Sequence, residues 1–162
     1  MKKQKITCHI CYNVTKTPQG EAPPTNCALC IADLQNPSSE TRKHETVVEK
    51  GAGGVMATAV QVMLTDTRLI FIGIDGSGGT AGAMGGLLGG AIAGAIAGAR
   101  SSRTKFNAVL LADIASINER VFGLLKNRFE LTIQTKNGGS FSFELTKKEM
   151  EKWRPDLFKF SA

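Results

Sequence analysis

Short apolar runs that are typical of β-strands fill much of the chain from residue 45 onward. Residues 60–64 and 68–72 flank a Thr-Asp-Thr turn at 65–67, which predicts a hairpin. The second run is apolar at odd and even positions alike, so it offers two apolar faces. A strand exposed on one side would alternate with polar residues, and we therefore expect both faces of this strand to be covered.

A second hairpin is predicted nearer the end of the chain. Residues 129–134 and 141–145 alternate between apolar and polar side chains. The segment between them contains Asn137-Gly138, and an Asn-Gly pair between alternating runs is the strongest short signal for a hairpin.

A C-terminal helix follows this hairpin in the prediction. Thr146 and Glu149 have the spacing of a capping box. Met150, Trp153 and Leu157 recur at helical spacing and predict the buried face of a helix that closes a sheet. Pro155 is expected to kink this helix or to end it early, because proline lacks a backbone N–H.

All four cysteines lie within residues 1–36, in two Cys-x-x-Cys pairs that fifteen residues separate: Cys8, Cys11, Cys27 and Cys30. This spacing predicts a closed, structural Zn²⁺ site of the zinc-ribbon type, and a segment with so few large apolar side chains needs such a site in order to fold. The alternatives are unrelated thiols or a redox pair, and no βαβ pattern supports the latter. The glycine that often follows the second cysteine of a zinc knuckle is replaced by Tyr12 and Ile31. We expect His9 to face solvent and assign no role to His44.

A block without charged residues spans 76–99, and its glycines recur at every fourth position: Gly78, Gly82, Gly86, Gly90, Gly94 and Gly98. On a helix these glycines would form a smooth ridge that lets another backbone or lipid approach closely. A flexible loop is the alternative. If the block is helical, it is a shallow membrane hairpin, an in-plane helix or a helix packed on another subunit. The face that carries Ile70, Ile72 and Ile74 is expected to hold its base. Arg100, Arg103 and Lys105 follow the block as candidates for lipid phosphates.

Length and charge narrow the function classes. The 162 residues are too few for a TIM barrel, which needs roughly 250. Of the net charge of +6, residues 100–162 carry +5, so we expect this last third to meet any anionic partner. The N-terminus is not followed by a secretion signal. The expected location is therefore cytoplasmic, with peripheral attachment at the inner face of the membrane as an option.

Several segments resemble the bacterial PH-like and GRAM domains. They are residues 64–71 (Leu-Thr-Asp-Thr-Arg-Leu-Ile-Phe), residues 111–117 (Leu-Ala-Asp-Ile-Ala-Ser-Ile), the hairpin at 129–145 and the final helix with Trp153. The resemblance implies a mainly β fold, a bent antiparallel barrel capped by the C-terminal helix, in a non-enzymatic module that binds lipid or protein or self-associates. Arg68, Asp113 and Trp153 match the pattern and are expected to be architectural. The loop at 50–54 has one lysine, so no lipid headgroup site is carried over.

These observations divide the chain into a zinc ribbon (1–36), a linker (37–44) and a PH/GRAM-like domain (45–162) with a glycine-zipper insertion at 76–104. The predicted function is docking at a membrane surface, self-association, or both. The alternative is a cytosolic adaptor whose zinc ribbon binds a protein or, less favoured, nucleic acid.

A nucleotide-binding enzyme has weaker support. Residues 76–81 fit G-x-G-x-x-A, but the acid at Asp113 comes some thirty residues later, where about twenty are expected. We therefore expect no specific nucleotide, and no catalytic constellation stands out in the sequence.

Overall fold

The computed structural model describes residues 2–48, 53–55, 59–74 and 105–160 and shows a mainly β protein. The glycine block and Arg100 and Arg103 lie outside these residues, and of Lys105 only the backbone is described, as the first residue of β6. The predicted glycine ridge and phosphate contacts therefore stay predictions.

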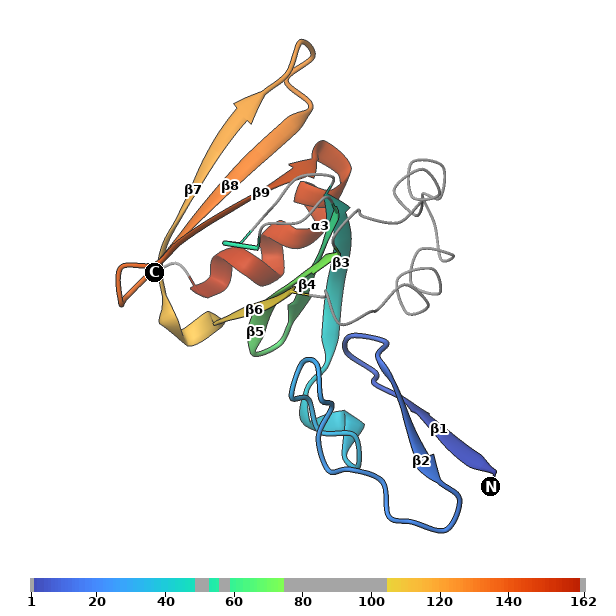
Figure 1. Cartoon of the computed structure of the whole chain (residues 1–162). Helices are drawn as coiled ribbons and strands as arrows, with labels where there is room; N and C mark the ends of the chain where they lie inside the picture. Colours follow the sequence, from blue (N-terminus) through green and yellow to red (C-terminus); the bar gives the residue numbers. More distant parts are fainter. Residues whose placement is uncertain (1, 49–52, 56–58, 75–104, 161–162) are drawn as a thin grey trace.

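Three antiparallel sheets build the described part of the molecule (Figure 1). The first is the hairpin of β1 (Lys3–Thr7) and β2 (Val14–Pro18). The second has the order β3 (Arg42–Val48), β4 (Ala59–Thr65), β5 (Arg68–Ile74) and β6 (Lys105–Leu110). The third has the order β7 (Ile114–Phe122), β8 (Arg128–Thr135) and β9 (Ser140–Thr146).

Both predicted hairpins are confirmed. In β4–β5 Leu64 pairs with Leu69 across the turn, and in β8–β9 Gln134 pairs with Ser140. Gly138 has a φ of +87°, a backbone conformation that glycine adopts readily. Because β5 and β6 are antiparallel neighbours, they do not form the parallel unit that the nucleotide-binding interpretation requires.

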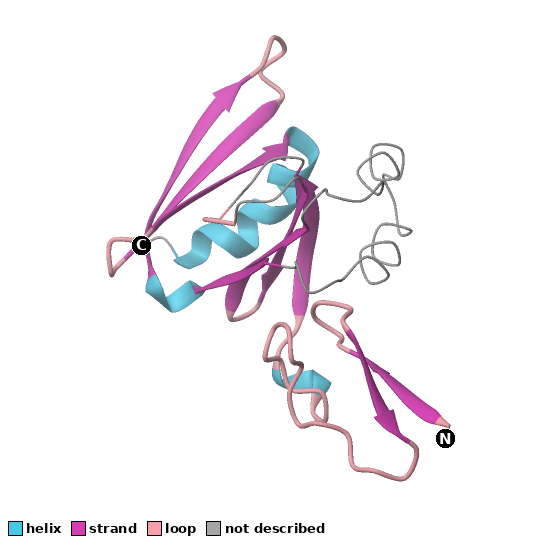
Figure 2. Ribbon diagram, in the orientation of Figure 1, coloured by secondary structure: helices cyan, strands magenta, loops and turns pink. Residues whose placement is uncertain are grey.

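The predicted barrel is not a closed one. Within the described residues β6 and β7 belong to different sheets, and the short 3-10 helix η2 (Leu111–Asp113) separates them. Two separate sheets therefore stand where one bent barrel was expected, and the helix α3 (Lys147–Leu157) packs with them (Figure 2).

The helix begins as predicted. The Thr146 backbone donates to Glu149 Oε2 at 2.8 Å, and the Glu149 backbone donates to Thr146 Oγ1 at 3.3 Å, which completes the capping box. The helix does not end at Pro155 but continues to Leu157, and the alternative expectation of a kink stays a prediction. Leu157 is fully buried, and this burial holds the last turn in place.

One apolar core lies between the two larger sheets and the helix. Its largest side chains are Phe71, Phe143 and Trp153, and the Trp153 ring lies 5.8 Å from that of Phe143. Gly53 crosses directly above Phe71, where an added Cβ would lie 2.3 Å from the ring. With its φ of +58°, this position requires glycine.

The segment predicted as a linker is structured. Residues 37–39 form the 3-10 helix η1 (Pro37–Ser39), and residues 42–44 belong to β3. His44, which was assigned no role, lies 2.7 Å from Asp156 Oδ2 and stacks on Trp153. This hydrogen bond is the largest cause of a lowered pKa of Asp156. The polar, turn-forming residues of this segment predicted a linker. Asp156 and Trp153, the contacts of His44, are more than a hundred residues away in sequence, so the local pattern could not show that the fold brings them together.

Candidate metal centre

Each Cys-x-x-Cys pair forms a tight turn held by two backbone hydrogen bonds. In the first turn the Tyr12 N–H donates to the Cys8 carbonyl at 3.0 Å, and the Cys8 N–H donates to the Asn13 carbonyl at 2.8 Å. The same two bonds, at 2.9 and 2.8 Å, join Cys27, Ile31 and Ala32. The two turns thus repeat one geometry, and each aims two sulfur atoms toward the same point.

The residue after each second cysteine has a left-handed backbone. Tyr12 and Ile31 both have a φ of +60°, although neither is glycine. This conformation costs roughly 1–2 kcal/mol for an L-residue, and it is rare for a β-branched one. The missing glycines therefore do not prevent the knuckle geometry, but something else must stabilise it.

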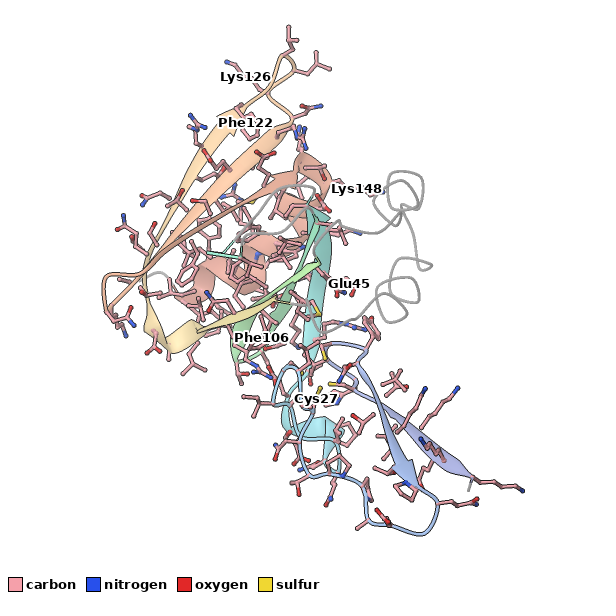
Figure 3. The ribbon with its side chains drawn as sticks, viewed as in Figure 1. Cys27, Glu45, Phe106, Phe122, Lys126 and Lys148 are labelled. Carbon is pink, nitrogen blue, oxygen red and sulfur yellow. The ribbon has the colours of Figure 1, made fainter. Side chains whose placement is uncertain are left out.

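The four sulfur atoms converge at the junction of the two turns. All of them lie within 4.8 Å of one another, and the Cys8–Cys30 and Cys11–Cys27 sulfur pairs are 3.5 and 3.6 Å apart. Tetrahedral zinc with bonds of about 2.3 Å separates its sulfur ligands by about 3.8 Å. The cysteines form no disulfide and are at most 1% exposed. This donor set could hold a metal ion, and Figure 3 shows Cys27 near the base of the sheet.

Without a cation the thiols share their protons unequally. The hydrogen bond with Cys11 lowers the pKa of Cys8 to about 6 and also lowers the pKa of Cys27. Hydrogen bonding among the sulfurs raises the pKa of Cys11, chiefly through Cys27, and that of Cys30, chiefly through Cys11. Four neighbouring thiolates repel one another, so a divalent cation is what would allow all of them to ionise.

The cysteine turns rest on the outer face of the β3–β6 sheet. The buried side chains of Met63, Ile70 and Ile72 form one apolar cluster with the four cysteines and Ile10. The prediction that both faces of β5 are covered is therefore confirmed. The cysteine turns supply this cover, and the expected base of the glycine segment lies outside the described residues.

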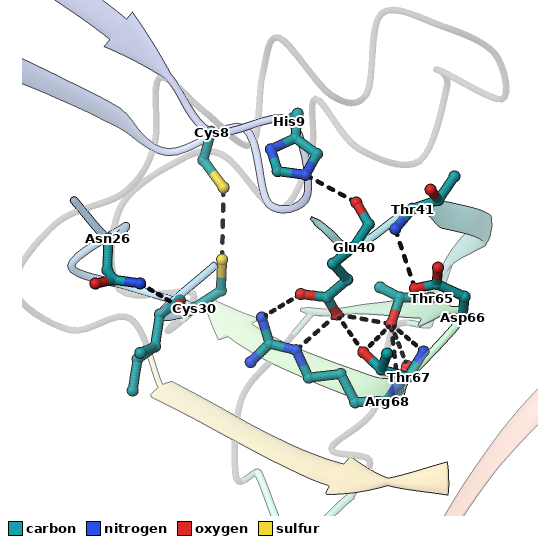
Figure 4. A network of polar contacts seen from close by, with 11 residues as sticks. Cys8, His9, Asn26, Cys30, Glu40, Thr41, Thr65, Asp66, Thr67 and Arg68 are labelled. Carbon is teal, nitrogen blue, oxygen red and sulfur yellow. Dashed lines mark hydrogen bonds and ion pairs between the residues drawn. The ribbon is translucent and has the colours of Figure 1, made fainter. Parts of the chain in front are cut away.

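A buried ion pair lies beside this contact (Figure 4). Arg68 Nε and Nη2 donate to the two Glu40 carboxylate oxygens at 2.8 and 2.9 Å. The hydroxyls of Thr65 and Thr67 donate to Glu40 Oε1 at 2.7 and 3.1 Å. Burial raises the pKa of Glu40. The hydrogen bonds, that of Arg68 first among them, lower it by a larger amount, so the pKa of Glu40 lies below its usual value.

Arg68 also interacts with Cys30, one of the four candidate metal ligands. Burial lowers the pKa of Arg68, but its hydrogen bonds and charge interaction with Glu40 outweigh burial, and Cys30 raises the pKa further. The guanidinium thus lies between the carboxylate and a candidate metal ligand, where it would offset part of the −2 charge of a four-thiolate Zn²⁺ complex. Arg68 was expected to be architectural, and in the structure it joins Glu40 to the cysteine turns through charge interactions and hydrogen bonds.

Two further contacts join the cysteine turns to the rest of the chain. His9 Nε2 lies 2.9 Å from the Glu40 carbonyl oxygen, so His9 is partly buried in a contact instead of facing solvent as expected. Arg42 donates to the Ile10 carbonyl at 3.2 Å, and its guanidinium lies 4.0 Å from the centre of the Tyr12 ring. Residues 8–12 are therefore held to β3 as well as to the outer face of the sheet.

Sequence reasoning missed the Glu40–Arg68 pair and the exposed Leu124 and Leu125 at the β7–β8 turn. The leucines had a local signal, because they lie between the turn-forming Gly123 and Asn127.

A comparison of the chain with protein-family models, curated proteins and solved structures finds no match.

Proposed function

We propose that this protein is a non-enzymatic binding module in which a structural zinc ion holds the N-terminal segment on a PH/GRAM-like scaffold. The observation that carries this proposal is the burial of all four cysteines. A catalytic zinc keeps one position open for water or substrate, whereas four thiolate ligands close the coordination shell. Zinc is favoured because it accepts four sulfur ligands in a tetrahedron and because thiolates are among its usual ligands.

Among the residues that the structure describes, the His44–Asp156 pair is the arrangement most similar to catalytic machinery. A histidine oriented by a carboxylate occurs in many hydrolases, where it activates a nucleophile. The described contacts of His44 are Asp156 and the Trp153 ring, and they tie β3 to α3. This favours a role in packing over one in catalysis.

The proposed activity is docking at a membrane surface, self-association, or both. None of the helices in the described residues is long and apolar enough to cross a membrane. The excess of positive charge in residues 100–162 suits an anionic surface. The glycine ridge, with Arg100, Arg103 and Lys105, remains a candidate for this contact.

A second candidate function rests on the first hairpin. Its strands are largely exposed and carry Lys3, Lys5 and Lys16, and Ile31 nearby is 68% exposed. A basic, exposed surface with an apolar residue beside it fits an acidic protein partner, as the adaptor hypothesis requires.

One experiment separates these functions. The full chain, purified under reducing conditions, is analysed for metal and then floated with phosphatidylcholine vesicles that contain or lack phosphatidylserine, beside a variant that lacks residues 78–99. We expect about one zinc per chain and binding to the anionic vesicles. Light scattering on both proteins tests whether the deletion reduces self-association. A monomer that binds neither type of vesicle would contradict the proposal and leave the adaptor hypothesis.

A further inference from the structure

The tip of the β7–β8 hairpin presents two leucines to solvent. Leu124 is fully exposed and Leu125 is 82% exposed, more than any other large apolar side chain in the described residues. The hairpin extends away from the N-terminal module, and Lys126 lies at its tip (Figure 3). Exposed leucines are ordinary when single, but an adjacent pair on a protruding turn indicates a contact.

The backbone holds these leucines outward. The Lys126 N–H donates to the Gly123 carbonyl at 3.0 Å, which closes a turn with the two leucines at its corners. Gly123 has a φ of +87° and Lys126 a φ of +49°. The Lys147 N–H donates to the Asn127 carbonyl at 2.9 Å and fixes the base of the turn to the start of α3. The leucines are therefore presented by an ordered turn and need no rearrangement to reach a partner.

Positive charge surrounds the leucines. Of the cations near the turn, Arg120 pairs with Glu130 at 2.6 Å and Arg128 with Glu144 at 3.6 Å. Two further carboxylates are near: that of Glu149 is held by the capping box, and that of the exposed Glu151 lies further along α3.

Three lysines are left over. Lys126, Lys147 and Lys148 are exposed and take part in none of the ion pairs found among the described residues. The hydrogen bond between Lys147 and Asn127 keeps the lysines at the start of α3 beside the turn. The tip thus combines an apolar point with free cations around it.

We propose that this tip is a membrane contact, at which Leu124 and Leu125 enter the interfacial region of an anionic bilayer while Lys126, Lys147 and Lys148 meet lipid phosphates. The inference rests on the proposed docking function and assigns that function to a surface outside the glycine segment. A stable protein interface takes about 800 Å² from each partner, which a five-residue turn does not supply. A bilayer needs no complementary shape, and lysines beside it extend their ammonium groups to the headgroups.

The test is flotation of the full chain with phosphatidylcholine vesicles that contain phosphatidylserine. The double variant Leu124→Ser/Leu125→Ser should bind about tenfold more weakly or worse, since burial of one leucine shifts a partition equilibrium by roughly that factor. The matched control is Leu110→Ser, which removes another exposed apolar side chain and should bind as the wild type does. Replacement of the three lysines by glutamine should weaken binding by roughly fivefold per lysine at low salt.

Insertion itself is measured with Leu125→Trp. Brominated phospholipids in the same vesicles should quench the fluorescence of the new tryptophan. The fluorescence of Leu110→Trp should not be quenched. The native Trp153 is only 2% exposed, so it should not be quenched in either variant. Wild-type binding by the double serine variant, or no quenching in Leu125→Trp, would overturn the inference and leave the docking function in place. Failure of the wild type to bind any vesicle would overturn membrane docking and this inference together. Thermal melts check that the variants are folded. We expect unchanged melting temperatures for the leucine variants, because neither leucine belongs to the apolar core.

Discussion

The two faces of strand β5 are equally buried, but they are covered in different ways. On the inner face Leu69 and Phe71 pack into the apolar core with the second sheet and Trp153. On the outer face Ile70 and Ile72 pack against the buried cysteines. Within one strand, successive side chains thus belong to two clusters of different composition.

The difference lies in what holds each cover in place. The inner cover consists of large apolar side chains on regular elements, and its burial is enough to stabilise it. The outer cover is a segment with few large side chains and two left-handed residues, Tyr12 and Ile31, so we expect it to depend on a metal ion at the four cysteines. We therefore expect a chelator to remove the outer cover and leave the inner core folded.

The largest effect should follow from Cys27→Ser. Structural zinc supplies about 10–16 kcal/mol in small zinc-binding peptides, and loss of one ligand removes most of that free energy. We expect residues 1–36 to lose zinc and unfold while the core around Trp153 stays intact. Elemental analysis and amide NMR spectra measure both effects.

Exposure of Met63, Ile70 and Ile72 in this variant should increase the binding of an apolar fluorescent dye. The control is Cys27→Ser compared with chelator-treated wild type, which should give matching spectra. Loss of the core signals along with the zinc would mean that the two faces fold as one unit.

The next effect should follow from Arg68→Met, which leaves the carboxylate of Glu40 buried without its cation. Breaking such a pair costs about 3–5 kcal/mol at neutral pH. The control is Arg120→Met, whose exposed pair with Glu130 should contribute less than about 1 kcal/mol. Urea unfolding measures both, and equal losses would contradict the assigned role of the buried pair.

The pH dependence of Arg68→Met has a definite sign. In the wild type the folded-state pKa of Glu40 is lowered, so its contribution to stability is present above the usual carboxyl range and is lost as pH falls through the folded-state pKa. In the variant the hydrogen bonds from Thr65 and Thr67 remain, but the bonds and the charge of Arg68 are lost while burial still acts, so the pKa of Glu40 is higher than in the wild type. The deficit relative to wild type should therefore shrink as pH falls below the usual carboxyl range.

The sharpest comparison of the two faces uses the neighbours Leu69 and Ile70. Each substitution by alanine should cost about 2–5 kcal/mol in the metal-loaded protein, because both side chains are fully buried. After chelation, Leu69→Ala should keep its cost and Ile70→Ala should lose most of it, since its face is then exposed. Urea unfolding with and without chelator gives the four values. An unchanged cost for Ile70→Ala would show that the cysteine turns stay packed without metal.

The smallest effect should come from Ile31→Gly. Glycine removes the strain of the left-handed backbone but gains freedom in the unfolded chain, so the net stabilisation should be about 1 kcal/mol. Competition with a chelating dye should show zinc bound roughly fivefold more tightly. Ala28→Gly, in the same turn without a left-handed backbone, is the control and should weaken binding; improvement in both variants would contradict the strain argument.

Features that depend on nearby residues were predictable. Asn137-Gly138 predicted a hairpin, Thr146 and Glu149 a helix start, and the cysteine spacing a shared site, because each rests on contacts a few residues apart or on a repeated motif. The continuation of α3 past Pro155 was not predictable from its residues alone, since it depends on burial of Leu157 in the core.

Local sequence also showed that β5 needs two covers, since its apolar residues occupy both faces. Which segments supply those covers was decided by the tertiary structure alone. The pattern of apolar residues along a strand indicates which faces are buried, but it does not indicate which segments of the chain cover those faces. The partner depends on contacts such as Arg68 with Glu40 and Ile70 with the cysteine turns, which span long stretches of chain and form only when the whole fold is assembled.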